Sequence, residues 1–229
     1  MEGFMAKRVV IAIDGPAGAG KSTIARAVAR KLGFVYINTG AMYRAVALWA
    51  QRLGVSDDDM HRLEQLALEA DVQFVPGTDS VLLNGEDVTA QLHTPEVAAG
   101  ASKVSSIPAV RRALVDKQRQ LAGGASVVME GRDIGTVVFP DAAVKLFLDA
   151  DPAVRARRRA EEMGKSISMA VAEELAKRDE RDRTRAASPL MQAPDAVYLD
   201  TSDLSLDEVE SAILKLVRDR TTNGKEVAR

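Results

Sequence analysis

The residues with the clearest chemical meaning form a glycine-rich segment near the start of the chain, GPAGAGKST, from Gly15 to Thr23. It fits the P-loop pattern G-x-x-x-x-G-K-[ST] at every fixed position. Glycines let successive backbone N–H groups point inward, and the helix that follows adds the positive end of its dipole. Lys21 can reach the β- and γ-phosphates of a nucleotide, and the Ser22 hydroxyl can bind Mg²⁺. The residues expected to hold the phosphates are Gly15, Pro16, Ala17, Gly18, Ala19, Gly20, Lys21, Ser22 and Thr23.

The elements on either side of this segment are those that a P-loop requires. The apolar run Val9–Ile13 precedes it and predicts a buried strand. A helical pattern follows, with Ile24, Val28 and Leu32 on one face and Gly33 at its end. The alternative is a glycine-rich turn between a core strand and a helix, with no ligand.

A second chemical signal is the sequence KRDERDRTR at residues 177–185. On a helix, Arg178, Arg181, Asp182 and Arg185 share one face, because their spacings are three, four and seven residues. The guanidinium groups repel one another, and one carboxylate does not neutralise them. A bound phosphate would turn that repulsion into binding. The alternative is a solvated, salt-bridged helix face.

Further arginines lie where strands are expected to end. Arg132 and Asp133 come just after the apolar run at residues 126–129, so we expect them at the rim of the site rather than in bulk solvent. Arg44 lies one turn into a helix that begins after Thr39. The alternatives are a local ion pair for Arg132 with Asp133 and an exposed helix position for Arg44.

Two further observations concern basic residues outside these blocks. Arg155 and its neighbours at 157–159 form a cluster on a helix that starts after Asp151. His61 and His93 lack the spacing of metal ligands, so we expect surface roles for both.

Length and composition limit the class of protein. The chain has 229 residues, a net charge of −2 and no cysteine, which excludes disulfides and cysteine-ligated zinc. The charge gives no global basic field for nucleic acid or an anionic membrane. The N-terminus has no apolar stretch of signal-peptide length, so we expect a soluble cytoplasmic protein.

The apolar runs predict an α/β fold. Residues 35–37, 126–129, 144–148 and 197–199 form short uninterrupted runs, which suit a parallel sheet covered by helices on both faces. Helix signals separate most of them: Asp151-Pro152 predicts one helix start and the capping box from Ser205 to Glu208 another, while Thr94-Pro95 predicts a start near residue 95. Strands that alternate with helices are typical of a doubly wound sheet with its ligand at the carboxyl ends of the strands. At residues 70–106 this alternation is interrupted by short strand candidates around Asn84-Gly85, a strong hairpin signal. We expect a small antiparallel insertion there; a surface hairpin without function is the alternative.

Four blocks together resemble the bacterial-type cytidylate kinases: GPAGAGKST, NTGAMYR at residues 38–44, EGRDIGT at residues 130–136 and RDERDRTR at residues 178–185. The P-loop alone is widely shared, whereas the other blocks and the insertion are far more specific. The resemblance covers nearly the whole chain. It implies a nucleoside-monophosphate kinase fold over residues 1–229, with a five-stranded parallel sheet, a monophosphate-binding insertion at 70–106 and a lid at 155–165.

The same resemblance implies an activity. The γ-phosphoryl group of ATP would pass to CMP or dCMP with Mg²⁺ present, in a chain that we expect to be a monomer. Like-charged arginines in the lid would keep it open until both nucleotides bind.

The resemblance also implies residue roles. Lys21, Arg132, Arg158 and Arg178 would be catalytic, with Arg158 lying over the ATP phosphates. Ser22 would bind the metal ion. The remaining roles concern the acceptor: Thr39, Arg44, Arg132 and Arg185 for its phosphate, Arg178 and Asp182 for its sugar, and Ser102, Arg111 and Asp133 for its base.

Three positions depart from the family pattern. Glu130 stands where aspartate is common, Asn38 where an acidic residue is frequent, and Thr39 where some members have serine. Two other readings stay open. A small P-loop kinase for another acceptor would not need so many acceptor-side arginines if that acceptor were an alcohol. A nucleotide switch should carry an N-K-x-D motif, which the sequence lacks.

Overall fold

The computed structural model describes residues 8–162, 164, 166 and 168–222. Residues 163 and 165, at the end of the expected lid segment, lie outside the described residues. No described helix is long and apolar enough to cross a membrane. The elements follow one another as β1 (Val10–Asp14), α1 (Lys21–Leu32), β2 (Val35–Asn38), α2 (Thr39–Arg52), α3 (Met60–Glu69), β3 (Val72–Phe74), β4 (Val81–Leu83), β5 (Glu86–Asp87), the 3₁₀ turn η1 (Gln91–His93), α4 (Pro95–Val104), α5 (Pro108–Leu121), β6 (Val127–Gly131), the π-helical turn η2 (Ile134–Val138), β7 (Val144–Asp149), α6 (Pro152–Glu162), α7 (Met169–Thr184), β8 (Val197–Asp200) and α8 (Leu206–Thr222).

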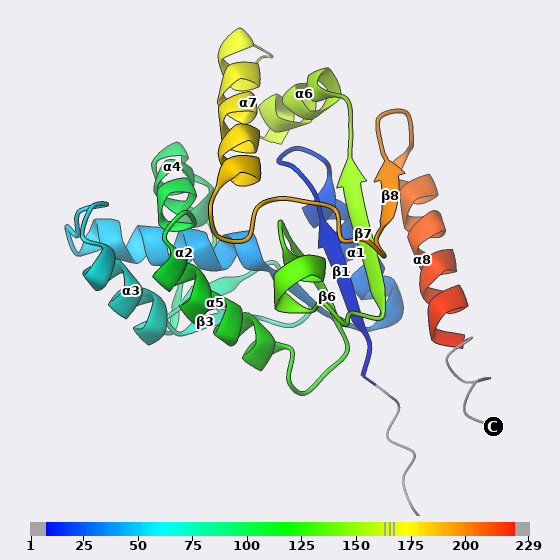
Figure 1. Ribbon diagram of the computed structural model, residues 1–229, viewed down its shortest axis with the longest axis horizontal. Coiled ribbons are helices and arrows are strands. Elements are labelled where there is room, and N and C mark those ends of the chain that lie inside the picture. Colours follow the sequence, from blue (N-terminus) through cyan, green and yellow to red (C-terminus); the bar gives the residue numbers. More distant parts are fainter. Residues whose placement is uncertain (1–7, 163, 165, 167, 223–229) are drawn as a thin grey trace, which may run out of the picture.

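The central sheet has five parallel strands in the order β2-β6-β1-β7-β8. All five residues of β1 are buried, because helices cover both faces of the sheet. On one face α1 and α8 pack against Ile11 and Ile13, and on the other α5 and η2 pack against Ala12 and Met129 (Figure 1). The predicted parallel α/β sheet is confirmed.

The sheet topology brings distant sequence blocks to one edge. Because the five strands are parallel, the P-loop after β1, the Arg132-Asp133 block after β6 and Thr39 after β2 all lie at the carboxyl ends of neighbouring strands. Helices α6 and α7 stand above that edge, beside the arrowheads of β1 and β7 in Figure 1.

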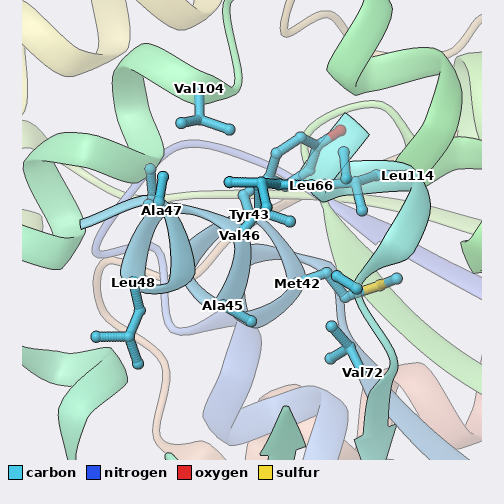
Figure 2. Close-up of a cluster of buried hydrophobic side chains, with 14 of the residues drawn as sticks. Met42, Tyr43, Ala45, Val46, Ala47, Leu48, Leu66, Val72, Val104 and Leu114 are labelled. Carbon is cyan, nitrogen blue, oxygen red and sulfur yellow. The ribbon is translucent and has the colours of Figure 1, made fainter. Parts of the chain in front are cut away.

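A second core lies beside the sheet. It joins α2, α3, α4 and α5 to the three-stranded antiparallel sheet β3-β4-β5. Figure 2 shows side chains of α2 pointing outward on several sides, toward Leu66, Val72, Val104 and Leu114. Asn84 and Gly85 both have positive φ, as the predicted tight hairpin requires. Residues 70–106 are therefore packed into the molecule and do not form a free surface hairpin.

The predicted helix caps are present. The Thr94 side chain accepts a hydrogen bond from Val97 N at the start of α4. Asp151 accepts one from Ala153 N in the first turn of α6, at 2.8 Å. Ser205 and Glu208 bond to each other's backbone N–H groups before α8, which is the reciprocal capping box.

Gly15 has no room for a side chain. Its φ is +149°, and a Cβ at this position would lie 1.9 Å from the carbonyl oxygen of Leu148 in β7. A side chain at position 15 would therefore push the P-loop away from β7.

We predict that Gly15→Ala lowers the melting temperature by several degrees, since backbone strain of this kind costs about 1–3 kcal/mol and the contact with Leu148 adds to it. Gly124→Ala is the matched control, because a Cβ there meets nothing within 4 Å. Thermal unfolding of both variants by circular dichroism measures the difference. Equal melting temperatures would show that the loop can shift away from β7 without cost.

Candidate active site

Two adjoining cavities open at the carboxyl edge of the central sheet. The P-loop cavity is lined by Ala17, Gly18, Gly20, Lys21, Ser22, Thr23, Asn38, Gly40, Arg44, Glu130, Gly131, Arg132, Arg159, Glu162 and Arg178. The arginine cavity is lined by Thr39, Gly40, Tyr43, Arg44, Leu92, His93, Ala98, Ala101, Ser105, Arg111, Gly131, Arg132, Asp133, Arg159, Arg178, Asp182 and Arg185.

The wall shared by the two cavities is strongly basic. Besides Gly40 and Gly131, the residues that line both are Arg44, Arg132, Arg159 and Arg178. These four come from α2, the residue after β6, α6 and α7, so the fold brings them together from distant parts of the chain. Guanidinium groups bind phosphate oxygens in a forked geometry. The shared wall can therefore hold two phosphate groups that approach from opposite sides.

Lys21 lies at the start of α1 with only 5% of its surface exposed. Its Nζ donates to the carbonyl oxygen of Pro16 at 2.6 Å. Burial, together with the nearby charge of Arg132, lowers the pKa of Lys21 to about 7. A bound phosphate would supply the negative charge that favours the protonated ammonium.

Glu130 faces the P-loop cavity from the end of β6, in the same cavity as Ser22. Its Oε1 accepts a hydrogen bond from the Tyr36 hydroxyl at 2.7 Å, and its carbonyl oxygen accepts one from Thr39 Oγ1 at 2.7 Å. Tyr36 thus orients the Glu130 carboxylate in this cavity.

These groups suit a magnesium ion. Mg²⁺ in nucleotide sites is typically held by one or two protein oxygens together with waters and substrate phosphates. Ser22 and Glu130 are such oxygens in one cavity. Within the described part of the chain, no cluster of three or more His, Asp or Glu side chains offers a complete protein site.

The arginine cavity carries an excess of positive charge, since six arginines and two aspartates line it. Arg132 Nε donates to Asp182 at 2.9 Å, and Arg111 forms a buried ion pair with Asp133. Among the described residues, Arg44 Nε and Arg185 Nη2 are buried without a hydrogen-bond partner. Burying such donors unpaired is costly, and an anionic ligand would satisfy them.

The pKa values reflect this crowding. Burial and the charge of Arg132 lower the pKa of Arg178 to about 10, so that it stays protonated at neutral pH. Burial alone would raise the pKa of Asp182, but Arg132 and Arg178 hold it below its ordinary value. Asp182 therefore remains an anion between two cations.

Most residues expected at the acceptor site line the arginine cavity: Thr39, Arg44, Arg111, Arg132, Asp133, Arg178, Asp182 and Arg185. Ser102 is not among the lining residues, whereas Ser105, one turn later near the end of α4, is. The Ser105 carbonyl oxygen accepts a hydrogen bond from Arg111 at 3.2 Å. Ala98 and Ala101 of α4 also line the cavity, so part of the 70–106 segment forms its wall.

Two expectations about basic residues are wrong. Arg181 was placed on the stripe facing the ligand, but it is exposed and its Nε donates to the carbonyl oxygen of Lys177 on its own helix. Arg155, counted among the like-charged arginines that would keep the lid open, is buried and ion-paired with Asp179 and Asp149. Whether each of these side chains faces solvent or the interior depends on the elements that pack against its helix.

The other arginines of α6 differ in orientation. Arg158 donates to both oxygens of Thr201, at 2.9 and 2.7 Å, and lies 3.8 Å from the place of a Cβ on Gly20. Arg159, the next residue, lines both cavities. The sequence indicates a basic cluster here, but it does not predict that Arg158 and Arg159 have different contacts.

Two further residues had no predicted role. His93 is exposed, as expected, and it also lines the arginine cavity. Asp14, the last residue of β1, is buried and accepts hydrogen bonds of 2.7 Å from Ile134 N and Gly135 N. Burial raises the pKa of Asp14 to about 6 despite these bonds. The sequence signal for Asp14 is its place directly after the apolar run Val9–Ile13.

The chain is similar to known proteins over most of its length. The family model described as "Cytidylate kinase" matches residues 11–219. This chain belongs to the cytidylate kinase family. The resemblance seen in the four sequence blocks is thereby confirmed.

Individual relatives agree with this assignment. A cytidylate kinase of Solibacter usitatus (strain Ellin6076) is 63% identical over 226 residues, covering 96% of this chain and 97% of the relative. In a bifunctional pantoate ligase/cytidylate kinase of Synechococcus elongatus (strain ATCC 33912 / PCC 7942 / FACHB-805), the match is 47% identical over 225 residues and covers 93% of this chain but 43% of that protein. A solved gluconokinase from Sinorhizobium meliloti 1021 shares the fold, with a TM-score of 0.52, 13% identity and coverage of 98% of this chain and 99% of that one.

We predict that Lys21→Met raises the melting temperature of the ligand-free protein, and does so more at about pH 6 than at about pH 9. The folded-state pKa of Lys21 is lowered from 10.5 to about 7, so the unfolded chain holds this proton more tightly between those values. Wild-type stability therefore gains with rising pH through that window, while the methionine variant has no such proton.

Differential scanning calorimetry at the two pH values measures the difference in melting temperature between the variant and wild type. Lys31→Met is the control, because the Lys31 side chain is 65% exposed. If the difference in melting temperature between Lys21→Met and wild type is the same at both pH values, the predicted pH dependence is wrong.

Proposed function

We propose that this protein transfers the γ-phosphoryl group of ATP to CMP or dCMP, giving ADP and the corresponding diphosphate. The observation that carries the proposal is the shared wall of four arginines between the P-loop cavity and the arginine cavity. Membership of the cytidylate kinase family supports the same substrates.

On the donor side, the backbone of the P-loop and Lys21 would hold the phosphates of ATP. Phosphoryl transfer needs little covalent help from the protein, but it requires two anionic groups in line and their charge neutralised. Arg132, Arg159 and Arg178 line both cavities, and they would neutralise the charge that develops between the two ligands. We also retain Arg158 as a donor-side candidate because it lies next to Gly20.

Magnesium would be held by Ser22, with Glu130 oriented by Tyr36 toward the same cavity. When bound, the ion would offset negative charge on the donor phosphates.

On the acceptor side, Arg44, Arg132 and Arg185 would bind the monophosphate, with Thr39 beside them. The Nε of Arg44 and Nη2 of Arg185, which are buried without a hydrogen-bond partner, are the donors that a phosphate would satisfy. Arg178 and Asp182 remain the candidates for the sugar.

Base choice would rest on Asp133 and Arg111, which form a buried pair in this cavity. The N4 amino group of cytosine donates to a carboxylate, whereas uracil presents an acceptor at the same place. Ser102 stays a candidate for the base, with Ser105 as its lining neighbour.

The broader expectations remain proposals of the same kind. We expect a cytoplasmic monomer that acts on small molecules and does not bind nucleic acid or membranes.

We predict ATP- and Mg²⁺-dependent phosphorylation of CMP and dCMP in a coupled assay for ADP. UMP, AMP, GMP and shikimate serve as competing acceptors, and Lys21→Met as the inactive control, since loss of such an electrostatic group costs about 10²–10³ in rate. A folded protein that leaves CMP and dCMP unchanged while phosphorylating another acceptor would overturn the proposal. ATP hydrolysis without any acceptor would instead point to a switch or ATPase.

We predict that Asp133→Asn raises the KM for CMP and reduces the preference for CMP over UMP by about one to two decades, because a well-aligned base contact is worth about 1–3 kcal/mol. Asparagine keeps the shape of a side chain that Arg111 and Arg185 surround. Steady-state kinetics with varied ATP should show little change in the KM for ATP. Unchanged selectivity would place cytosine recognition on other residues.

A further inference from the structure

The tip of the P-loop is held by a buried ion pair that the catalytic scheme above does not use. Arg155 of α6 and Asp179 of α7 are 6% and 3% exposed, and they pair through Arg155 Nη1 and Asp179 Oδ2. The same Nη1 donates to the carbonyl oxygen of Ala17 at 3.2 Å. Ala17 N in turn donates to Asp179 Oδ1 at 3.4 Å. One ion pair thus engages both backbone groups of a single P-loop residue.

The contacts around this pair leave little freedom. Arg155 Nε donates to the carbonyl oxygen of Ala150 at 3.0 Å, which ties the guanidinium to the end of β7. Ala17 packs with Ala156 and Leu175 in a small buried cluster. A Cβ on Gly18 would lie 2.7 Å from the carbonyl oxygen of Arg155, so the loop backbone touches the first turns of α6.

The same helices carry arginines of the shared wall. Arg159 lies one turn after Arg155 on α6, and Arg178 precedes Asp179 on α7. Both line the two cavities, whereas neither Arg155 nor Asp179 lines either one. Ala17 and this pair therefore connect the P-loop directly to the two helices that carry Arg159 and Arg178.

We propose that Arg155 and Asp179 are positioning residues for phosphoryl transfer, which hold the P-loop tip in register with Arg159 and Arg178 without touching substrate. The inference rests on the proposed kinase function. Its physical basis is the strict geometry of transfer, in which a misplacement of about 1 Å can cost about 10²-fold in rate. The competing explanation is that the pair contributes to folding stability alone.

Single substitutions do not separate these explanations, because removing one partner leaves a buried charge that destabilises the fold. The double variant Arg155→Met/Asp179→Leu removes both charges of this pair and fills the space with apolar groups of similar size. The other carboxylate beside Arg155, that of Asp149, is 21% exposed and keeps contact with solvent. Such replacements of buried ion pairs are often neutral or stabilising. We expect its melting temperature to stay near that of wild type or above that of Asp179→Asn, and its kcat with ATP and CMP to fall about 10- to 100-fold.

A conservative variant and a control complete the test. Arg155→Lys keeps the charge but loses the fork that reaches both Ala17 and Asp179, so its kcat should also fall. Asp195→Asn is the control for Asp179→Asn, since Asp195 pairs with Lys145 at 2.9 Å and lines neither cavity. It should change stability without lowering kcat.

A measurement independent of turnover is amide hydrogen exchange at Ala17, followed by nitrogen-15 NMR. We expect protection of this N–H to fall about tenfold or more in the double variant. A double variant with wild-type kcat and wild-type protection at Ala17 would overturn the proposal. If wild type phosphorylates a different acceptor, the proposed substrate fails, but the same comparison of kcat and exchange still decides the role of the pair.

Discussion

The site depends on holding many guanidinium groups together at the carboxyl edge of one sheet. Six arginines line the arginine cavity, and four of them also line the P-loop cavity. Left alone, such groups would repel one another and lose their hydration. Asp133 and Asp182 reduce that repulsion inside the site through their pairs with Arg111 and Arg132. The carboxylates compensate only part of the charge, which leaves the cavity suited to an anion.

The fold meets this constraint by placing each charged group at the end of a rigid element. Strand β6 ends in the block that carries Arg132 and Asp133, and α2 begins at Thr39 with Arg44 one turn inside it. On helix α7, Arg178 and Asp182 line the arginine cavity. These elements are anchored in two hydrophobic cores, which fix where each charged residue enters the site.

Several of these features cost stability. Lys21 is buried with a lowered pKa, Asp14 is buried with a raised one, and Gly15 has a backbone conformation that excludes other residues. Groups with such shifted pKa values concentrate at functional sites. The hydrophobic packing of α1, α8 and the central sheet offsets these costs. Arg155 differs, because it is paired with Asp179 and Asp149 and it engages the P-loop backbone.

The sequence alone determined the elements and their order. Apolar runs predicted the parallel strands, caps predicted the starts of α4, α6 and α8, and Asn84-Gly85 predicted the hairpin, because each depends on a few adjacent residues. The four blocks, of which the P-loop is one, likewise identified the family.

Only the tertiary structure decided which of several neighbouring side chains face the site. Arg155, Arg158 and Arg159 are close in sequence, yet one is buried against Asp179, one bonds to Thr201 and one lines both cavities. Ser102 and Ser105 differ in the same way along α4. Successive helix residues point about 100° apart, and the partner that each one meets comes from a segment far away in the chain. Local patterns carry no information about that partner.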